Sequence, residues 1–121
     1  MNDSPARQAS AAAAGQAAEQ AALDYLIRQG LKPVQRNFHC RFGEIDLIMQ
    51  SGATLVFVEV RKRTSSRYGG AAASITASKQ ARLIKAAQVY LQQYAHPPAC
   101  RFDALAFEGE KIIWLQNVIE S

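Results

Sequence analysis

The stretch GEIDLIMQSGATLVFVEVRKR (residues 43–63) decides the expected fold. It contains two apolar segments typical of strands, residues 43–50 and 54–63, and the Ser51-Gly52 pair between them favours a turn. The stretch therefore predicts a β-hairpin. Its second strand is unusual because it places one carboxylate, Glu59, between two valines and then adds three cations in a row.

The register expected for this hairpin brings two carboxylates together. If the loop has four residues, Asp46 pairs with Glu59, and Glu44 then faces Arg61. Because side chains alternate along a strand, Asp46, Glu59 and Arg61 share one face of the sheet. The opposite face is expected to be apolar and to hold Ile45, Leu47, Val56, Val58 and Val60. A two-residue loop would instead place Asp46 opposite Phe57, with Glu59 on its diagonal.

Two opposed carboxylates repel each other, and something must relieve that repulsion. At about 5 Å and an effective dielectric constant near 20, the cost is roughly 3 kcal/mol, a large share of a typical stability of about 5–15 kcal/mol. A raised pKa, a cation such as Arg61, or a divalent metal would lower it. Mg²⁺ binds converging carboxylates together with water and substrate phosphates. The alternative is a half-exposed hairpin with an ordinary Glu44–Arg61 ion pair.

The rest of the chain predicts an α/β fold. Residues 1–10 are expected to be a disordered tail, and residues 11–121 a single domain. The remaining elements are expected to be a helix at 11–29, a strand at 33–40, a helix from Thr76 or Ser78 to about Tyr94, and strands at 101–108 and 111–120. This order fits a mixed five-stranded sheet flanked by helices. The helical crossover allows the third and fourth strands to be parallel.

The charge is unevenly distributed along the chain. Between residues 60 and 102 there is no Asp or Glu, although the net charge of the whole chain is only +4. Such a segment suggests a polyanionic partner, usually nucleic acid, and the alternative is a basic face kept for solubility. No apolar run approaches the roughly 18 residues that span a bilayer, so no membrane is expected as a partner. Cys40 and Cys100 suggest no disulfide framework, which favours the cytoplasm.

Four segments of the chain carry a family resemblance. GEIDLI, LVFVEVRKR, KQARL and GQAAEQAALDYL resemble the YraN family of small bacterial proteins, over residues 15–118. That family is similar to Holliday junction resolvases and other nucleases of the PD-(D/E)xK, restriction-endonuclease-like superfamily. The resemblance implies a restriction-endonuclease-like α/β core and cleavage of DNA, branched or damaged DNA included, with Mg²⁺ or Mn²⁺ as cofactor.

The resemblance also implies roles for individual residues. Asp46 and Glu59 match the two motif acids and would be metal ligands, with Glu19 as the additional acid on the first helix. Gln80 matches the glutamine on the helix after the motif strand. Glu19 and Gln80 also lie on the expected inward faces of their helices.

Arg61 stands where the superfamily motif has lysine, and Ile45 replaces the motif proline. A guanidinium keeps its proton at any working pH, so Arg61 cannot act as a general base, although it can stabilise charge on a phosphoryl group. The pKa of the attacking water would then have to be lowered by the metal. Two functions therefore stay open: an endonuclease, or a weakly active or inactive nucleic-acid-binding module of the same fold.

Several residues outside the motif are expected to contact nucleic acid. Arg63, Arg67 and Tyr68 belong to a Gly-rich loop that could grip the phosphate backbone, with Tyr68 stacking on a base. Lys79, Arg82 and Lys85 share the expected outer face of the second helix. For both groups the alternative is a solvated surface. A two-fold homodimer would suit a junction-cutting enzyme, because two strands must be cut.

Overall fold

The computed structural model describes residues 5–63 and 76–119, and of residues 5–14 and 63 only the backbone. The elements are α1 (Pro5–Arg28), β1 (Lys32–Cys40), β2 (Gly43–Ser51), β3 (Thr54–Arg63), α3 (Ala77–Leu91), β4 (Cys100–Glu108) and β5 (Lys111–Leu115). The sheet has five strands in the order β1-β2-β3-β4-β5. β3 and β4 are parallel, and the other neighbours are antiparallel. The expected mixed five-stranded sheet and α/β fold of restriction-endonuclease-like type are confirmed.

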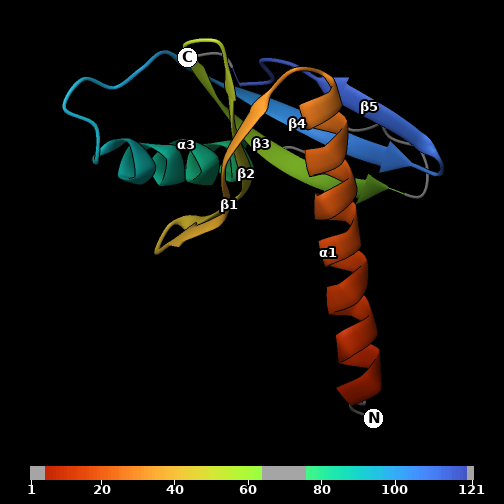
Figure 1. Cartoon of the computed structure of the whole chain (residues 1–121). Helices are drawn as coiled ribbons and strands as arrows, with labels where there is room; N and C mark the ends of the chain where they lie inside the picture. The colour runs from red at the N-terminus through yellow and green to blue at the C-terminus, as the bar shows by residue number, and fades with distance from the viewer. Residues whose placement is uncertain (1–4, 64–75, 120–121) are drawn as a thin grey trace.

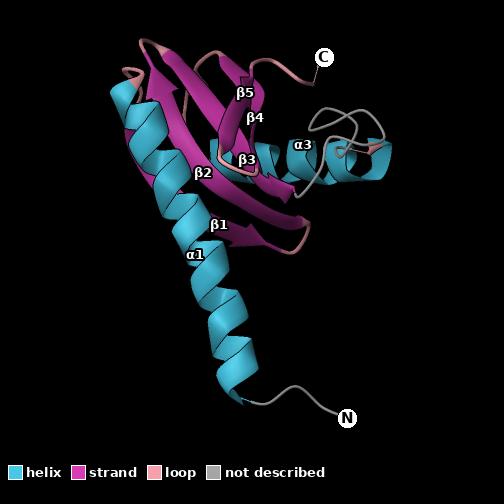
Figure 2. Cartoon of the chain, turned by 90° about the vertical axis from the view of Figure 1, so that its right-hand side faces the viewer, coloured by secondary structure: helices cyan, strands magenta, loops and turns pink. Residues whose placement is uncertain are grey.

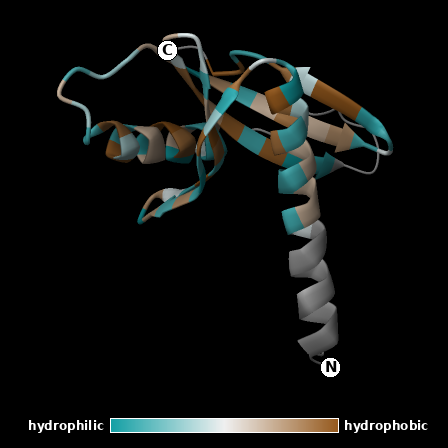
Figure 3. Ribbon diagram, in the orientation of Figure 1, coloured by the Kyte–Doolittle hydropathy of each residue, from teal (hydrophilic) through white to brown (hydrophobic). Residues whose placement is uncertain are grey.

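The two helices cover opposite faces of the sheet (Figures 1 and 2). One core cluster lies between α1 and the sheet and includes Leu26, Leu47, Val56, Val58 and Leu105. The other lies under α3 and includes Ile45, Ile48, Phe57, Leu83 and Tyr90. The hydrophobic residues follow the central strands and the part of α1 that meets the sheet (Figure 3). The middle of the central strands is therefore buried on both sides, and the polar groups there, Asp46, Glu59 and Asp103, are held away from bulk water.

The register of the β2–β3 hairpin is the expected one as far as the pairing extends. Gln50 pairs with Leu55 and Ile48 with Phe57. The turn is tighter than expected, because Ser51 and Thr54 also pair and Gly52 adopts a φ of 60°. The paired register ends at Leu47 and Val58. Asp46 and Glu59 thus lie directly beyond the last rung of the ladder.

The prediction that Ile45 shares a face with Leu47 is wrong. Ile45 packs into the cluster under α3, whereas Leu47 packs under α1. The facing strand, β1, explains the change. Its Asn37 has a φ of 53°, which is not an extended conformation, and it lies between the Arg36–Leu47 and Phe38–Ile45 pairs. The regular alternation of side chains between the two faces of the sheet is therefore interrupted at this point. The far end of the β1–β2 hairpin consequently turns towards α3 (Figure 1).

The last strand is shorter than the expected 111–120, because β5 ends at Leu115. After it, Asn117 has a φ of 55° and its backbone N–H donates to Oδ1 of Asp103 at 2.9 Å. Asp103 is 1% exposed and also accepts hydrogen bonds from Arg101 and from the Trp114 indole. Arg101 and Asp103 form an ion pair with Nε 3.1 Å from Oδ1, and Asp103 thus joins both sides of the sheet end.

The helix boundaries also differ from the expected ones. α1 begins at Pro5 instead of about Ala11, and proline is well tolerated in a first helical turn. Residues 5–10 of the expected disordered tail thus belong to this helix, and residues 1–4 lie outside the described residues. α3 ends at Leu91 instead of Tyr94, and of the two candidate caps Thr76 is the N-cap. Within the described residues no helix is both long and apolar enough to cross a membrane.

Candidate active site

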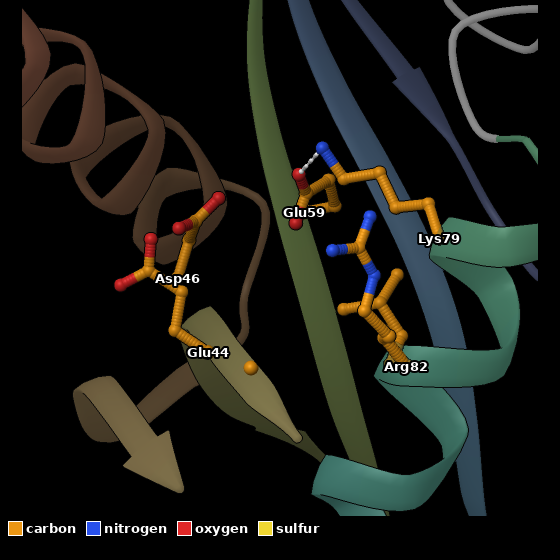
Figure 4. A pocket seen from close by; sticks show the side chains of 7 residues that line it. Glu44, Asp46, Glu59, Lys79 and Arg82 are labelled. Atoms are coloured by element: carbon orange, nitrogen blue, oxygen red, sulfur yellow. Dashed lines mark ion pairs between the residues drawn. The ribbon is translucent and has the colours of Figure 1, made fainter. Parts of the chain in front are cut away.

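A pocket of about 240 Å³ lies between the β2–β3 hairpin and α3. Its described lining residues are Gly43, Glu44, Asp46, Glu59, Lys79, Arg82 and Leu83. Figure 4 shows the carboxylates coming from the two strands and the two cations from the first turns of α3. The structure therefore brings the two motif acids, Asp46 and Glu59, to one pocket, on the same side of the sheet.

Asp46 is a buried acid, with 9% of its surface exposed. Its carboxylate accepts a hydrogen bond from the backbone N–H of Val60 at 2.8 Å, which replaces the next rung of the β2–β3 ladder. Burial, and next the negative charge of Glu59, raise its pKa from 3.8 to about 7, although the Val60 hydrogen bond acts in the opposite direction. A raised pKa keeps Asp46 protonated to a higher pH, and this relieves part of the repulsion expected between the carboxylates of Asp46 and Glu59.

Glu59 is 7% exposed and is neutralised by two cations. The Lys79 ammonium lies 2.6 Å from its Oε1, and Nη1 of Arg61 lies 3.4 Å from the same atom. Arg61 thus contributes as expected, but Lys79 is the closer partner. The prediction that Lys79 lies on the outer face of its helix is wrong, because its side chain is only 25% exposed and turns into the pocket. The sequence could not supply this contact, because it depends on where α3 lies relative to β3 in the folded chain.

The alternative Glu44–Arg61 ion pair is not formed. Glu44 instead lies 3.3 Å from Nδ1 of His39, its cross-strand neighbour on β1. Both side chains are more than half exposed. Glu44 also contributes to the raised pKa of Asp46, so it adds negative charge to the pocket without being buried in it.

Glu19 and Gln80 are half-buried, as their helix positions predicted. Glu19 lies near enough to Asp46 for its charge to raise the pKa of that acid. The backbone N–H of Gln80 donates to the carbonyl of Thr76 at 2.9 Å in the first turn of α3. Neither residue belongs to the described lining of the pocket.

The donor set fits a divalent cation bound by two carboxylates. Among the described residues no three His, Cys, Asp or Glu side chains form a group that could hold a metal ion, so Glu19 does not complete the expected three-acid set. It comes from α1, whereas the pocket is built from β2, β3 and α3. Mg²⁺ does not require such a cage, because it uses one or two carboxylates together with water and substrate phosphates. The raised pKa of Asp46 marks uncompensated negative charge that a cation would relieve.

Cations also gather at the tip of the β1–β2 hairpin, next to Gly43 of the pocket lining. The Arg41 guanidinium lies 4.8 Å and the Lys85 ammonium 5.5 Å from the centre of the Phe42 ring. Arg82 packs close to the neighbouring Gly43: a Cβ added to this glycine would lie 3.9 Å from the Cβ of Arg82. We call Arg41, Arg82 and Lys85 the basic rim; all three are exposed. The sequence interpretation missed Arg41 because it precedes the acid-free segment.

The other predicted contacts to nucleic acid cannot be located. Arg67 and Tyr68 lie outside the described residues, and so does the side chain of Arg63, the last residue of β3. Their expected contacts with a phosphate backbone stay predictions.

Comparison with known proteins identifies the relatives of the chain. The family model described as "Uncharacterised protein family UPF0102" matches residues 18–107. A UPF0102 protein of Janthinobacterium sp. (strain Marseille) is 59% identical over 108 residues, which cover 89% of this chain and 88% of that protein. One from Herminiimonas arsenicoxydans is 59% identical over 107 residues, covering 88% and 86%. One from Aeromonas hydrophila is 53% identical over 111 residues, covering 89% and 85%. The matched segment contains the whole described pocket.

Proposed function

Because the chain belongs to the uncharacterised protein family UPF0102, which is the YraN family, and carries an acidic pocket bordered by cations, we propose that it is a divalent-metal-dependent endonuclease acting on DNA. The observation that carries the proposal is the pair of buried carboxylates, Asp46 and Glu59, in one pocket. Burying two such groups side by side is costly unless a cation joins them. Perturbed acids of this kind are candidates for a functional site.

Each part of the pocket has a place in this function. Asp46 and Glu59 would hold Mg²⁺ or Mn²⁺, and the ion would supply Lewis-acid chemistry and a water of lowered pKa. Arg61, beside Glu59, would stabilise negative charge on the transferring phosphoryl group. The basic rim would hold the phosphates that flank the cleaved bond, and these contacts would carry no sequence preference.

A cleavage assay with paired variants tests the proposal. Linear, nicked and four-way-junction DNA are incubated with the purified protein in Mn²⁺, in Mg²⁺ and in EDTA. We expect cleavage in Mn²⁺ or Mg²⁺ and none in EDTA. The cleavage rate should fall at least about 100-fold in Asp46→Ala and Glu59→Ala, as it does when a group that acts directly on the reacting centre is removed. Glu110→Ala is the matched control, because it removes an exposed acid from the turn between β4 and β5.

The result that contradicts the nuclease proposal is equally definite. If no substrate is cut in either metal, or if cleavage survives unchanged in both acid variants, the two carboxylates do not catalyse phosphodiester hydrolysis.

A second candidate is a nucleic-acid-binding module without turnover. The observation that favours it is the ion pair of Lys79 with Glu59, which already neutralises one of the two acids. In this case DNA affinity should fall steeply with salt and be insensitive to divalent metal. DNA binding that Mg²⁺ strengthens, and that loses this response in Glu59→Ala, would exclude the second candidate.

A further inference from the structure

Lys79 is placed as the closest counter-ion of the second motif acid. Its ammonium lies 2.6 Å from Oε1 of Glu59, and the two side chains are 25% and 8% exposed. The Arg61 contact to the same oxygen is longer, 3.4 Å, and the Arg61 side chain is more exposed, at 33%. The backbone of Lys79 is fixed as well, because its N–H donates to the hydroxyl of Thr76, the N-cap of α3.

A divalent ion bound to Glu59 would compete with the Lys79 ammonium for the same carboxylate. Both would contact the same carboxylate in a poorly solvated pocket, where like charges repel strongly. Lysine carries its charge on a flexible four-carbon chain, so the ammonium can move while the helix stays in place. Since Lys79 lines the pocket, an ammonium released from Glu59 remains on the pocket wall.

We infer that Lys79 is a resident counter-ion of Glu59 that a divalent cation displaces, and that its ammonium then contacts the substrate phosphate in the same pocket. The inference rests on the proposed function. In the motif strand, β3, Arg61 stands at the position of the motif lysine. The inference gives the role of that lysine to Lys79 of α3. Two consequences follow for a variant without the ammonium: metal binding loses a competitor, and the bound phosphate loses a partner.

Lys79→Met tests both consequences, because it keeps the length of the side chain and removes only the charge. Titration calorimetry with Mn²⁺ should show binding tightened about tenfold, the size expected when a charged hydrogen bond no longer has to be broken. With Ca²⁺ replacing Mn²⁺, to hold the DNA uncut, the affinity for a short duplex should fall about tenfold. A purely structural role would not move the two affinities in opposite directions.

Two further variants sharpen the result. Lys111→Met removes the same charge from an exposed position at the start of β5 and should leave Mn²⁺ affinity unchanged. Lys79→Arg keeps a cation beside Glu59 and should bind Mn²⁺ as weakly as the natural protein. Far-UV circular dichroism confirms that each variant is folded, and Lys79→Gln replaces Lys79→Met if the latter is not.

The outcomes separate this inference from the proposed function. If Mn²⁺ binds at Asp46 and Glu59 but Lys79→Met binds it no more tightly, the displacement of Lys79 is refuted and the metal-dependent function stands. If tighter Mn²⁺ binding is not accompanied by weaker DNA binding, the phosphate contact is refuted. The natural protein and Lys79→Met should both lose Mn²⁺ binding when Glu59→Ala is added. If neither of them binds Mn²⁺ through Glu59 in this way, the inference and the metal-dependent function fail together.

Discussion

Asp46 and Glu59 lie in one pocket but accommodate their charge differently. Glu59 has Lys79 and Arg61 beside it, so its negative charge is compensated. Asp46 has one backbone donor, the N–H of Val60, and its pKa is raised to about 7 by burial and by Glu59. Cations thus compensate the charge of one acid, and the pKa of the other lies near neutral pH. The difference arises because the ammonium of Lys79, from α3, is paired with Glu59.

The raised pKa makes Asp46 a source of instability at neutral and alkaline pH. Well below pH 4 the carboxyl is protonated in both the folded and the unfolded chain and costs nothing. As the pH rises from about 4 to about 7, ionisation favours the unfolded state, so the free energy of unfolding falls. Asp46→Asn keeps an acceptor for Val60 and removes the charge. It should raise the free energy of unfolding by on the order of 2 kcal/mol at pH 8, and by little at pH 4.

Urea unfolding of both proteins at pH 4, 6 and 8, without divalent metal, measures this effect. Glu110→Gln, a change at an exposed acid, provides the control and should give the same stability difference at every pH. An Asp46→Asn protein no more stable than the natural one at pH 8 would show that burial does not penalise the Asp46 carboxylate.

At the scale of secondary structure, the first turn of α3 joins stability to the site. The Oγ1 of Thr76 accepts from the backbone N–H of Lys79 at 3.2 Å, so the cap and the pocket cation belong to one turn. Thr76→Ala should lower the free energy of unfolding by about 1 kcal/mol, the usual cost of a lost N-cap. It should also loosen the turn that places Lys79 beside Glu59.

Thermal unfolding and amide hydrogen exchange check this prediction. Thr76→Ser retains the capping oxygen and should behave nearly as the natural protein does. Equal stability and equal exchange in the first turn of α3 for the alanine and serine variants would mean that the cap contributes nothing.

At the scale of the whole molecule, charge of opposite sign is arranged around one opening. The acids come from the β2–β3 hairpin. The basic rim, Arg41, Arg82 and Lys85, lies beside them at the tip of the β1–β2 hairpin and on α3. A phosphodiester chain could lie across the rim with one phosphate directed into the pocket. The homodimer and the cytoplasmic location expected from the sequence stay predictions.

Charge reversal on the rim should weaken DNA binding in a salt-dependent way. Arg41→Glu combined with Lys85→Glu removes two phosphate contacts, so the slope of log affinity against log salt should decrease by about 2. Fluorescence anisotropy with a labelled duplex at several salt concentrations measures the slope. Lys32→Glu combined with Lys111→Glu makes the same change in net charge on β1 and β5, away from the pocket, and should alter the slope little. Equal effects of the two pairs would contradict a localised rim.

The sequence by itself determined the order of the strands along the chain and the presence of Asp46 and Glu59 on neighbouring strands. These features depend on local patterns, because alternation and turn residues act over a few positions. The sequence left two hairpin registers open, and the structure has the one in which Ile48 pairs with Phe57. The bend at Asn37, the turn of Lys79 into the pocket and the closure of the sheet end by Asp103 were decided by the tertiary structure. The Lys79–Glu59 and Asn117–Asp103 contacts join residues that are separated in the chain, and which charges meet depends on how the layers pack. The sequence supplied the two acids, and the packing of α3 supplied the cation beside one of them.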